Sequence, residues 1–241
     1  MVNTMTILEI TAQLAADVDR LSFAPPVTHV YNPLRYAWRA HRQYLEKWGH
    51  ARHRIILVGM NPGPWGMAQT GIPFGEVNLV RDWIGIRDGV VKPDLEHSKR
   101  PIDGFSCRRS EVSGARLWGW ARDRFGSPER FFRRFFVYNY CPLSFLEETG
   151  RNRTPDKLPV AERNSLFSVC DRALEETVKA LEPEGVLGIG VFAEGRISAV
   201  VDSSSLLVGR LLHPSPASPK ANRGWAKMVE EELAGLGIQL P

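Results

Sequence analysis

The chain has 241 residues, of which 43% are hydrophobic and 24% are charged. This length suits one α/β domain, and the composition excludes a disordered chain and a membrane-spanning one. The net charge of +4 and the pI of about 9.1 favour an anionic partner only weakly, because net charge governs association rather than fold. We expect a single domain over residues 1–241 that is monomeric and intracellular, with no membrane partner.

Hydrophobic periodicity predicts two helices near the N-terminus. The first covers residues 5–21 and is ended by Pro25-Pro26, and the second covers residues 33–48 with a proline in its first turn. Four short apolar runs follow that are typical of strands buried on both faces, at residues 54–59, 134–139, 185–190 and 205–212.

Helical stretches separate and follow these strands, at residues 114–125, 160–181, 192–201 and 218–236. Alternation of strand and helix predicts a three-layer α/β/α sandwich around a central four-stranded parallel sheet. Three of the strands run into Gly- or Pro-rich polar segments, at residues 59–64, 139–142 and 213–219. Since ligands of open parallel sheets bind beyond the carboxyl ends of the strands, we expect these loops to converge on one cleft.

Cysteine and histidine spacing favours neither a disulfide framework nor a metal site. Cys107, Cys141 and Cys170 form no C-x-x-C pair. His50 and His53 lie three apart in a basic stretch, whereas zinc needs three or four convergent ligands. We therefore expect no metal and no cofactor.

Basic residues gather in four places, at residues 50–54, 108–109, 130–134 and 151–153. Phosphate contacts and solvated surface are equally good interpretations of each cluster. The stretch 92–113 reads as a long basic surface loop that could face nucleic acid.

Two residues of the first loop could act on a ligand. Asn61 lies in GMNPGPWG (residues 59–66), a tight turn that matches no phosphate-binding or dinucleotide motif. It is either the first polar side chain that the strand delivers to the cleft or a turn former. Phe74, between Pro73 and Gly75, is either a core residue or a platform for stacking a planar base.

The other loops offer an amide and an imidazole. Asn139 ends an apolar strand, where its side chain either satisfies nearby backbone or reads the edge of a base. His213 is either structural or acts as a ligand, a general acid or a donor to a developing oxyanion. The prolines of residues 213–219 make a rigid wedge, and a helix starting there would offer free N–H groups to phosphate, with charge from Lys220 and Arg223.

Two segments resemble the signature motifs of the single-strand-selective monofunctional uracil-DNA glycosylases, within the uracil-DNA glycosylase superfamily. They are GMNPGPWGMAQTGIPFGEV (residues 59–77) and HPSPASP (residues 213–219), and YNYCPL (residues 138–143) resembles the family's base-recognition strand end. The order and spacing match over nearly the whole chain. The resemblance implies a uracil-DNA glycosylase-like fold and, as partner, single- or double-stranded DNA containing uracil or related lesions.

The resemblance also implies roles residue by residue. Asn61 is similar to the catalytic asparagine that orients the attacking water, and His213 to the catalytic histidine that stabilises the departing uracil anion through O2. Phe74 looks like the residue that stacks on the flipped base, and Asn139 like the residue that reads its Watson–Crick edge. The implied pocket-lining residues are Met60, Gly63 and Met67. The stretch that would enter DNA contains Pro214, Ser215, Pro216, Ala217 and Ser218, with Lys220 and Arg223 beyond it.

One position departs from the family pattern. Family members carry an arginine after HPSP, where Ala217 stands here. A small side chain fills the gap left by a flipped nucleotide less well. Two expectations remain open, namely weaker duplex penetration or compensation by Lys220 and Arg223.

The residue types fit hydrolysis of a glycosidic bond. Cleavage builds positive charge on the sugar and negative charge on the base, so the enzyme needs donors to the base and a positioned water. The amide of Asn61 is not a base, so the glycosidic bond should be largely broken before the water attacks. We also expect a slower enzyme than one with aspartate at this position. No amine is placed for a Schiff base, so the expected product is an abasic site without strand cleavage.

Gly63 bears on the substrate range. It resembles the position of a tyrosine that blocks 5-methyl groups in uracil-only relatives, and glycine leaves room there. We therefore expect the enzyme to accept 5-hydroxymethyluracil, with xanthine as a further candidate.

Two other functions compete with this hypothesis. A nucleotide- or cofactor-binding α/β enzyme would use the same loops, but the phosphate-loop and dinucleotide fingerprints are missing. A non-catalytic damage-binding module would bind abasic sites without releasing a base, and the complete set of Asn61, Phe74, Asn139 and His213 argues against it.

Overall fold

The structure is a computed structural model that describes residues 5–50 and 55–241. The predicted strand start at Arg54, the basic residues of 51–54 and His53 lie outside these ranges. Within them, no helix is long and apolar enough to cross a membrane.

A four-stranded parallel sheet forms the centre of the fold and confirms the predicted sheet. Its order is β3-β2-β6-β7. The strands are β2 (Ile55–Gly59), β3 (Phe135–Asn139), β6 (Gly185–Ile189) and β7 (Leu207–Leu211). β2, β3 and β6 are buried along their whole length, which is why they read as continuous apolar runs.

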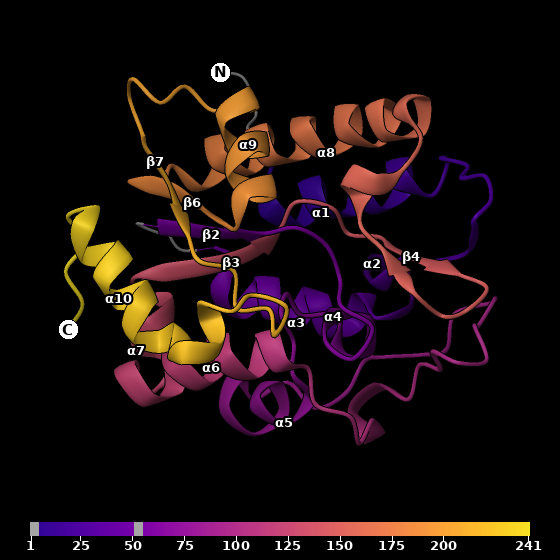
Figure 1. Cartoon of the computed structure of the whole chain (residues 1–241), viewed down its shortest axis with the longest axis horizontal. Coiled ribbons are helices and arrows are strands. Elements are labelled where there is room, and N and C mark those ends of the chain that lie inside the picture. Colours follow the sequence, from indigo (N-terminus) through magenta and orange to yellow (C-terminus); the bar gives the residue numbers. More distant parts are fainter. Residues whose placement is uncertain (1–4, 51–54) are drawn as a thin grey trace.

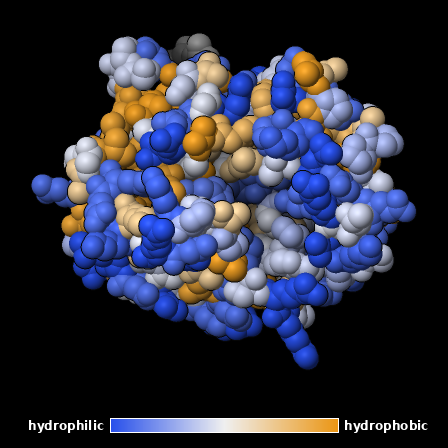
Figure 2. All heavy atoms as spheres, in the orientation of Figure 1, coloured by the Kyte–Doolittle hydropathy of each residue, from blue (hydrophilic) through white to orange (hydrophobic). Residues whose placement is uncertain are grey.

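Helices cover both faces of this sheet, as the alternation predicts (Figure 1). One face carries α1 (Ile7–Val18), α8 (Val160–Leu181) and α9 (Val191–Val200). The other carries α6 (Val112–Phe125), α7 (Pro128–Phe132) and α10 (Trp225–Gly235). The fold is therefore a three-layer α/β/α sandwich. Hydrophilic residues cover most of the face seen in Figure 2.

The predicted helix over residues 33–48 is two helices, α2 (Pro33–Tyr36) and α3 (Trp38–Trp48). They are separated at Ala37, whose backbone is not helical. Tyr44 of α3 donates its hydroxyl to the Val137 carbonyl at 2.8 Å, which satisfies an acceptor on the edge strand β3.

The start of the predicted C-terminal helix at residue 218 is wrong. Residues 221–223 form a single 3-10 turn and α10 begins at Trp225. Pro219 and Gly224, whose φ of +118° is left-handed, interrupt regular helix here. The free helical N–H groups expected at Ser218 are therefore not present at that point.

A second sheet was not predicted. It is antiparallel, in the order β1-β4-β5, with β1 (Val27–Tyr31), β4 (Ser144–Glu147) and β5 (Asn152–Arg153). The segment after Asn139 carries the chain from the central sheet into this one. Other elements missed from the sequence are short: α4 (Met67–Thr70), α5 (Val77–Leu79), a π-helix at Val80–Ile84, α7, and 3-10 turns at Gly104–Ser106 and Pro155–Lys157.

Aromatic side chains fix α6 against the central sheet. The ring of Trp120 meets those of Phe125, Phe131 and Phe135 at centroid distances of 5.8, 6.2 and 6.0 Å. Such edge-to-face pairs each add about 0.5–1.5 kcal/mol beyond area burial. The helix is thus a rigid base for the loops above it.

Candidate active site

The expected convergence of the three loops is found at the carboxyl ends of the central strands. A pocket of about 330 Å³ opens there. Seven residues singled out from the sequence line it: Met60, Asn61, Gly63, Phe74, Asn139, His213 and Ser215.

Backbone hydrogen bonds join the first two loops beyond the ends of their strands. The N–H of Tyr140 donates to the Gly59 carbonyl, and the N–H of Cys141 donates to the Met60 carbonyl, both at 2.9 Å. The loop bearing Asn61 therefore runs beside the loop that follows Asn139. This pairing fixes the position of both amide side chains.

Asn61 is half-buried at the pocket wall, and its amide nitrogen is anchored. Nδ2 donates to the Leu143 carbonyl at 3.1 Å. With the nitrogen fixed, the carbonyl oxygen is the group left to accept a hydrogen bond from a ligand or a water. Asn61 is thus more than a local turn former.

His213 is held as a neutral imidazole with a defined tautomer. The Ser215 backbone N–H donates to Nδ1 at 3.1 Å, so Nδ1 is unprotonated and the ring proton is on Nε2. Burial lowers the pKa of His213 below its usual value. Gly190, at the end of β6, packs against the ring; a Cβ there would lie 3.3 Å from the His213 Cβ.

Asn139 carries an unsatisfied acceptor. Its Nδ2 donates to the sulfur of Met67 at 3.2 Å, whereas its buried Oδ1 has no hydrogen-bond partner among the described residues. Leaving such an acceptor unpaired costs about 1–3 kcal/mol. A ligand N–H in the pocket would recover this energy.

Met67 does not line the pocket, contrary to prediction. Its side chain is 2% exposed and lies behind the Asn139 amide, where it orients that amide instead of touching the pocket space.

Gly59 was missed in the sequence, although it shapes the same region of the structure. A Cβ at Gly59 would lie 2.4 Å from Asn139 Oδ1 and 2.5 Å from Phe74 Cε2.

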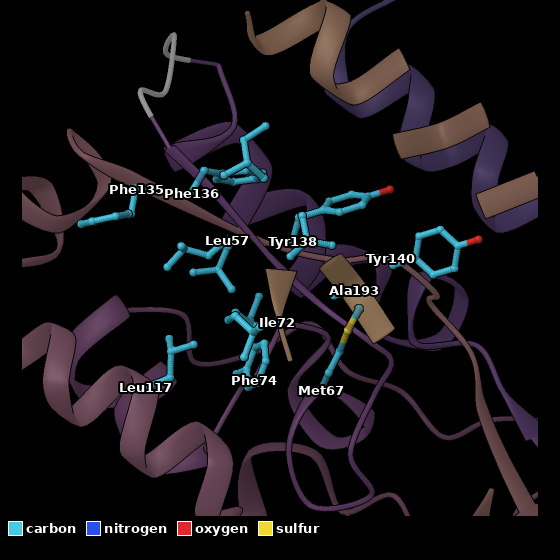
Figure 3. Close-up of a cluster of buried hydrophobic side chains, with 14 of the residues drawn as sticks. Leu57, Met67, Ile72, Phe74, Leu117, Phe135, Phe136, Tyr138, Tyr140 and Ala193 are labelled. Atoms are coloured by element: carbon cyan, nitrogen blue, oxygen red, sulfur yellow. The ribbon is translucent and has the colours of Figure 1, made fainter. Parts of the chain in front are cut away.

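Phe74 adopts a left-handed backbone with φ of +54°, which a bulky residue rarely adopts. Phe74 is 9% exposed, and its ring packs in the core with Ile72 (Figure 3). The alternative interpretation of Phe74 as a core residue is therefore correct in part. Its ring also lines the pocket, with its centroid 6.2 Å from that of His213. Close packing holds the strained turn, since a Cβ at Gly114 would lie 2.0 Å from the Phe74 carbonyl oxygen.

Glu111 is a pocket residue that sequence reasoning missed. It caps α6 by accepting hydrogen bonds from the N–H groups of Ser113 (3.2 Å) and Gly114 (2.9 Å). Burial raises the pKa of its carboxyl group, and Glu76 adds to the effect. The carboxyl carbon would lie 3.5 Å from a Cβ at Gly63, so Glu111 bounds the space that Gly63 leaves open. A glutamate before VSG in the sequence signals only a helix cap.

Asn152 and Thr154 also line the pocket and were missed, because β5 was not predicted. Asn152 Nδ2 donates to the Pro62 carbonyl at 3.4 Å, and its Oδ1 accepts from the Ser144 hydroxyl at 3.1 Å. The second sheet thus supports the loop that carries Asn61.

The segment after His213 is a compact turn rather than a helix start. The N–H of Ala217 donates to Ser215 Oγ at 3.1 Å, and the N–H of Ser218 donates to the Ser215 carbonyl at 3.0 Å. Pro216 and Ala217 are exposed at its tip, and Lys220 and Arg223 are exposed beyond it. Of residues 214–218, only Ser215 lines the pocket.

The side chain of Arg116 in α6 stabilises this turn through hydrogen bonds. Its Nη1 donates to the carbonyls of Pro214 (3.0 Å) and Ser215 (3.3 Å), and its Nη2 donates to Asn222 Oδ1 (2.8 Å). Asn222 in turn donates to the Pro216 carbonyl at 2.9 Å. No local pattern in the sequence indicates this role of Arg116.

The arrangement suits a flat, neutral heterocycle. The pocket offers an aromatic face, a donor at His213 Nε2 and an unsatisfied acceptor at Asn139, with a second acceptor at Asn61. In the described part of the chain, no three His, Cys, Asp or Glu side chains cluster as they would around a metal ion.

Comparison with known proteins identifies the family. The model of the uracil DNA glycosylase superfamily matches residues 46–233, which include both motifs. The single-strand selective monofunctional uracil-DNA glycosylase of Rattus norvegicus is 48% identical over 96% of this chain and 84% of its own length. The chain belongs to the single-strand selective monofunctional uracil-DNA glycosylase family. The relative from Mus musculus is 47% identical with the same coverage.

The fold agrees with this membership of the glycosylase family. The crystal structure of Pedobacter heparinus SMUG2 superposes with a TM-score of 0.68 and covers 97% of both chains at 17% identity, a likeness in fold alone. The predicted family and fold are therefore confirmed.

Proposed function

We propose that this protein is a monofunctional DNA glycosylase of base-excision repair, which flips uracil and related damaged bases out of DNA and hydrolyses the N-glycosidic bond. Family membership supports the reaction class. The observation that carries the proposal is the buried, unpaired Oδ1 of Asn139, a residue that lines the pocket. It matches the N3–H of uracil, a donor placed between two carbonyl acceptors.

Base recognition in this proposal uses Phe74 and Asn139. The base stacks on the Phe74 ring, and Asn139 Oδ1 accepts the N3–H. Base flipping costs a few kcal/mol and costs least for mismatched or unpaired bases, which favours damaged and single-stranded sites. Met60 and Gly63 bound the rest of the pocket.

Bond cleavage uses His213 and Asn61. As the bond from N1 to the sugar C1′ breaks, its electron pair moves onto the base, and His213 Nε2–H donates to the developing charge on O2. Asn61 Oδ1 accepts a hydrogen bond from the water whose oxygen then bonds to C1′. The water loses a proton as its oxygen bonds to C1′, and the departing base anion takes one up, so the products are the neutral free base and an abasic site. A neutral donor in a buried site is effective because few solvent dipoles need to reorganise.

The substrate range is a finer part of the proposal. Gly63 leaves space at the wall formed by Glu111, which favours acceptance of 5-hydroxymethyluracil, with xanthine as a further candidate. The turn over residues 214–218, with Lys220 and Arg223, contacts the DNA, and the enzyme acts as a monomer without a cofactor.

The test uses a labelled single-stranded oligonucleotide with one uracil, without added metal or cofactor. Strand breaks only after hot alkali are expected, since an abasic site is alkali-labile, and borohydride should trap no protein–DNA adduct. Breaks without alkali would contradict the monofunctional mechanism. If uracil, 5-hydroxymethyluracil and xanthine all stayed intact while abasic DNA was bound, the damage-binding alternative would replace the proposal.

A further inference from the structure

A second hollow, with a volume of about 630 Å³, is lined by residues close along the chain to those of the active-site pocket. Its lining is strongly basic. Four cationic residues, Lys99, Arg100, Arg108 and Arg109, face one acidic residue, Asp103. The basic side of the hollow is formed by the stretch 92–113, which was predicted as a basic surface loop. Two features differ from that prediction: His97, Ile102 and Gly104 are buried, and α6 already begins at Val112.

Trp65 fixes two of these arginines. The guanidinium carbons of Arg109 and Arg100 lie 4.4 Å and 5.2 Å from the centroid of its ring. Stacking on an indole holds a guanidinium in place while its N–H groups stay free to bind an anion. In addition, Arg100 Nε is buried without a hydrogen-bond partner in the described ranges.

The buried Gln69 makes the two walls of the hollow one rigid unit. Its Nε2 donates to the carbonyls of Pro64 (3.0 Å) and Pro101 (2.9 Å). Its Oε1 accepts from the N–H groups of Asp103 (2.9 Å) and Gly104 (3.1 Å). All four hydrogen-bonding positions of the amide are used, so the basic wall is tied to the loop that carries Asn61.

The hollow and the active-site pocket are lined by residues from the same two segments of the chain. On one segment, Gly63 lines the pocket and Trp65 lines the hollow. On the other, Glu111 lines the pocket and Arg109 lines the hollow. A strand whose flipped base fills the pocket therefore carries its neighbouring phosphates toward Arg100 and Arg109.

Two of the other basic clusters differ from this one, since residues 130–134 lie away from the pocket and Arg153 beside it is already paired. Arg130, Arg133 and Arg134 lie together next to the amino end of β3, at the opposite end of the strand from Asn139. Arg153 forms an ion pair with Glu147 at 3.0 Å and donates to the Lys157 carbonyl.

We propose that the hollow at Trp65 is a phosphate subsite for the DNA strand next to the flipped nucleotide, with Arg100 and Arg109 as its contacts. This inference rests on the proposed function, because it places the strand by the base in the pocket. For single-stranded DNA, each phosphate that a protein neutralises steepens the dependence of log K on log salt by about 0.7.

The test measures binding of a uracil-free single-stranded oligonucleotide at several salt concentrations by fluorescence anisotropy. For Arg100→Ala/Arg109→Ala we expect weaker binding and a slope shallower by about 1.4, from two lost contacts. The matched control, Arg130→Ala/Arg133→Ala, removes the same charge at the far end of β3 and should bind with the wild-type slope.

If the double variant unfolds, the single variant Arg109→Ala replaces it, because the Arg109 side chain is exposed and its removal should not disturb the fold. For Arg109→Ala the expected change in slope is about 0.7. A wild-type slope and affinity in the Trp65-hollow variants, or an equal loss in the control, would overturn the proposal. The uracil-free probe separates this result from the chemistry, because binding remains measurable even if no base is released.

Discussion

The backbone N–H of Ser215 donates a hydrogen bond to Nδ1 of His213 at 3.1 Å, and this bond decides what the imidazole can do. It places the ring proton on Nε2, so the imidazole of this pocket-lining residue is a neutral donor. Protonation of Nδ1 would break the bond. Burial, which lowers the pKa of His213, acts in the same direction.

We therefore expect kcat/KM to be flat around neutral pH and to fall on acidification, with an apparent pKa below the ordinary histidine value of about 6.5. The fold should also lose the His213 contribution to stability as pH falls, because the unfolded chain binds the proton more readily. A pH–rate profile with a uracil oligonucleotide checks this. A rate that rises on acidification would show instead that a cationic His213 is the active form.

Arg116 tests how far catalysis depends on the turn that follows His213. Arg116→Ala removes the donors to the Pro214 and Ser215 carbonyls. We expect a loss of about 1–3 kcal/mol in the free energy of unfolding and a fall in kcat of about 10- to 100-fold, because the His213 loop shifts. Thermal unfolding and single-turnover kinetics measure the two effects.

The matched control for Arg116 is Arg122→Ala on the same helix. Arg122 is exposed and pairs only with its neighbour Asp123 in the described structure, so we expect wild-type kinetics from it. Equal kinetics for Arg116→Ala and wild type would mean that the turn needs no support from α6.

Gly59 is expected to tolerate no side chain. The Cβ of Gly59→Ala would overlap Asn139 Oδ1 and the Phe74 ring, so both groups must shift from their present positions. We expect about 1–3 kcal/mol of destabilisation from overpacking and a fall in kcat/KM of about 100-fold. Steady-state kinetics and thermal unfolding are the measurements.

Gly195→Ala in α9 is the control for this substitution. A Cβ there meets nothing within 4 Å, and alanine favours helix over glycine, so the variant should be about 0.5–1 kcal/mol more stable with unchanged activity. Wild-type activity in Gly59→Ala would argue that Asn139 and Phe74 do not hold the base.

Ala217 tests the exposed tip of the turn. A larger cationic side chain would fill the gap left by a flipped nucleotide and meet a phosphate. Ala217→Arg should therefore raise the rate on double-stranded DNA relative to single-stranded DNA, by about tenfold for 1.4 kcal/mol. Ala217→Met supplies size without charge. An unchanged ratio in both variants would place the wedge elsewhere.

The parts of the fold that could be predicted are those encoded by local patterns. The strands of the central sheet are apolar runs, and α8 was predicted with its observed bounds of Val160–Leu181, because a long amphipathic repeat specifies both period and ends. β5 is two residues long and carries no such pattern, so the second sheet and the pocket residue Asn152 were missed.

The site was predictable only where a motif or a strand end marked it. Asn61, Phe74, Asn139 and His213 fall at such places, and the structure brings them to one pocket, while their roles stay predictions. Arg116 contacts residues 98 and 99 positions away, and the position of Met67 behind Asn139 depends on a contact across 72 residues. Contacts of this kind leave no local trace in one sequence.

The central claim is that the pocket holding Asn61 and His213 is where the glycosidic bond breaks. The most direct measurement compares single-turnover formation of alkali-labile sites by wild type, Asn61→Ala and His213→Ala on a uracil-containing single strand, with DNA binding measured alongside. The account predicts rapid site formation by wild type and a loss of at least about 100-fold in each variant, while binding of the DNA is retained. Wild-type rates in both variants would contradict it and move the chemistry to another part of the molecule.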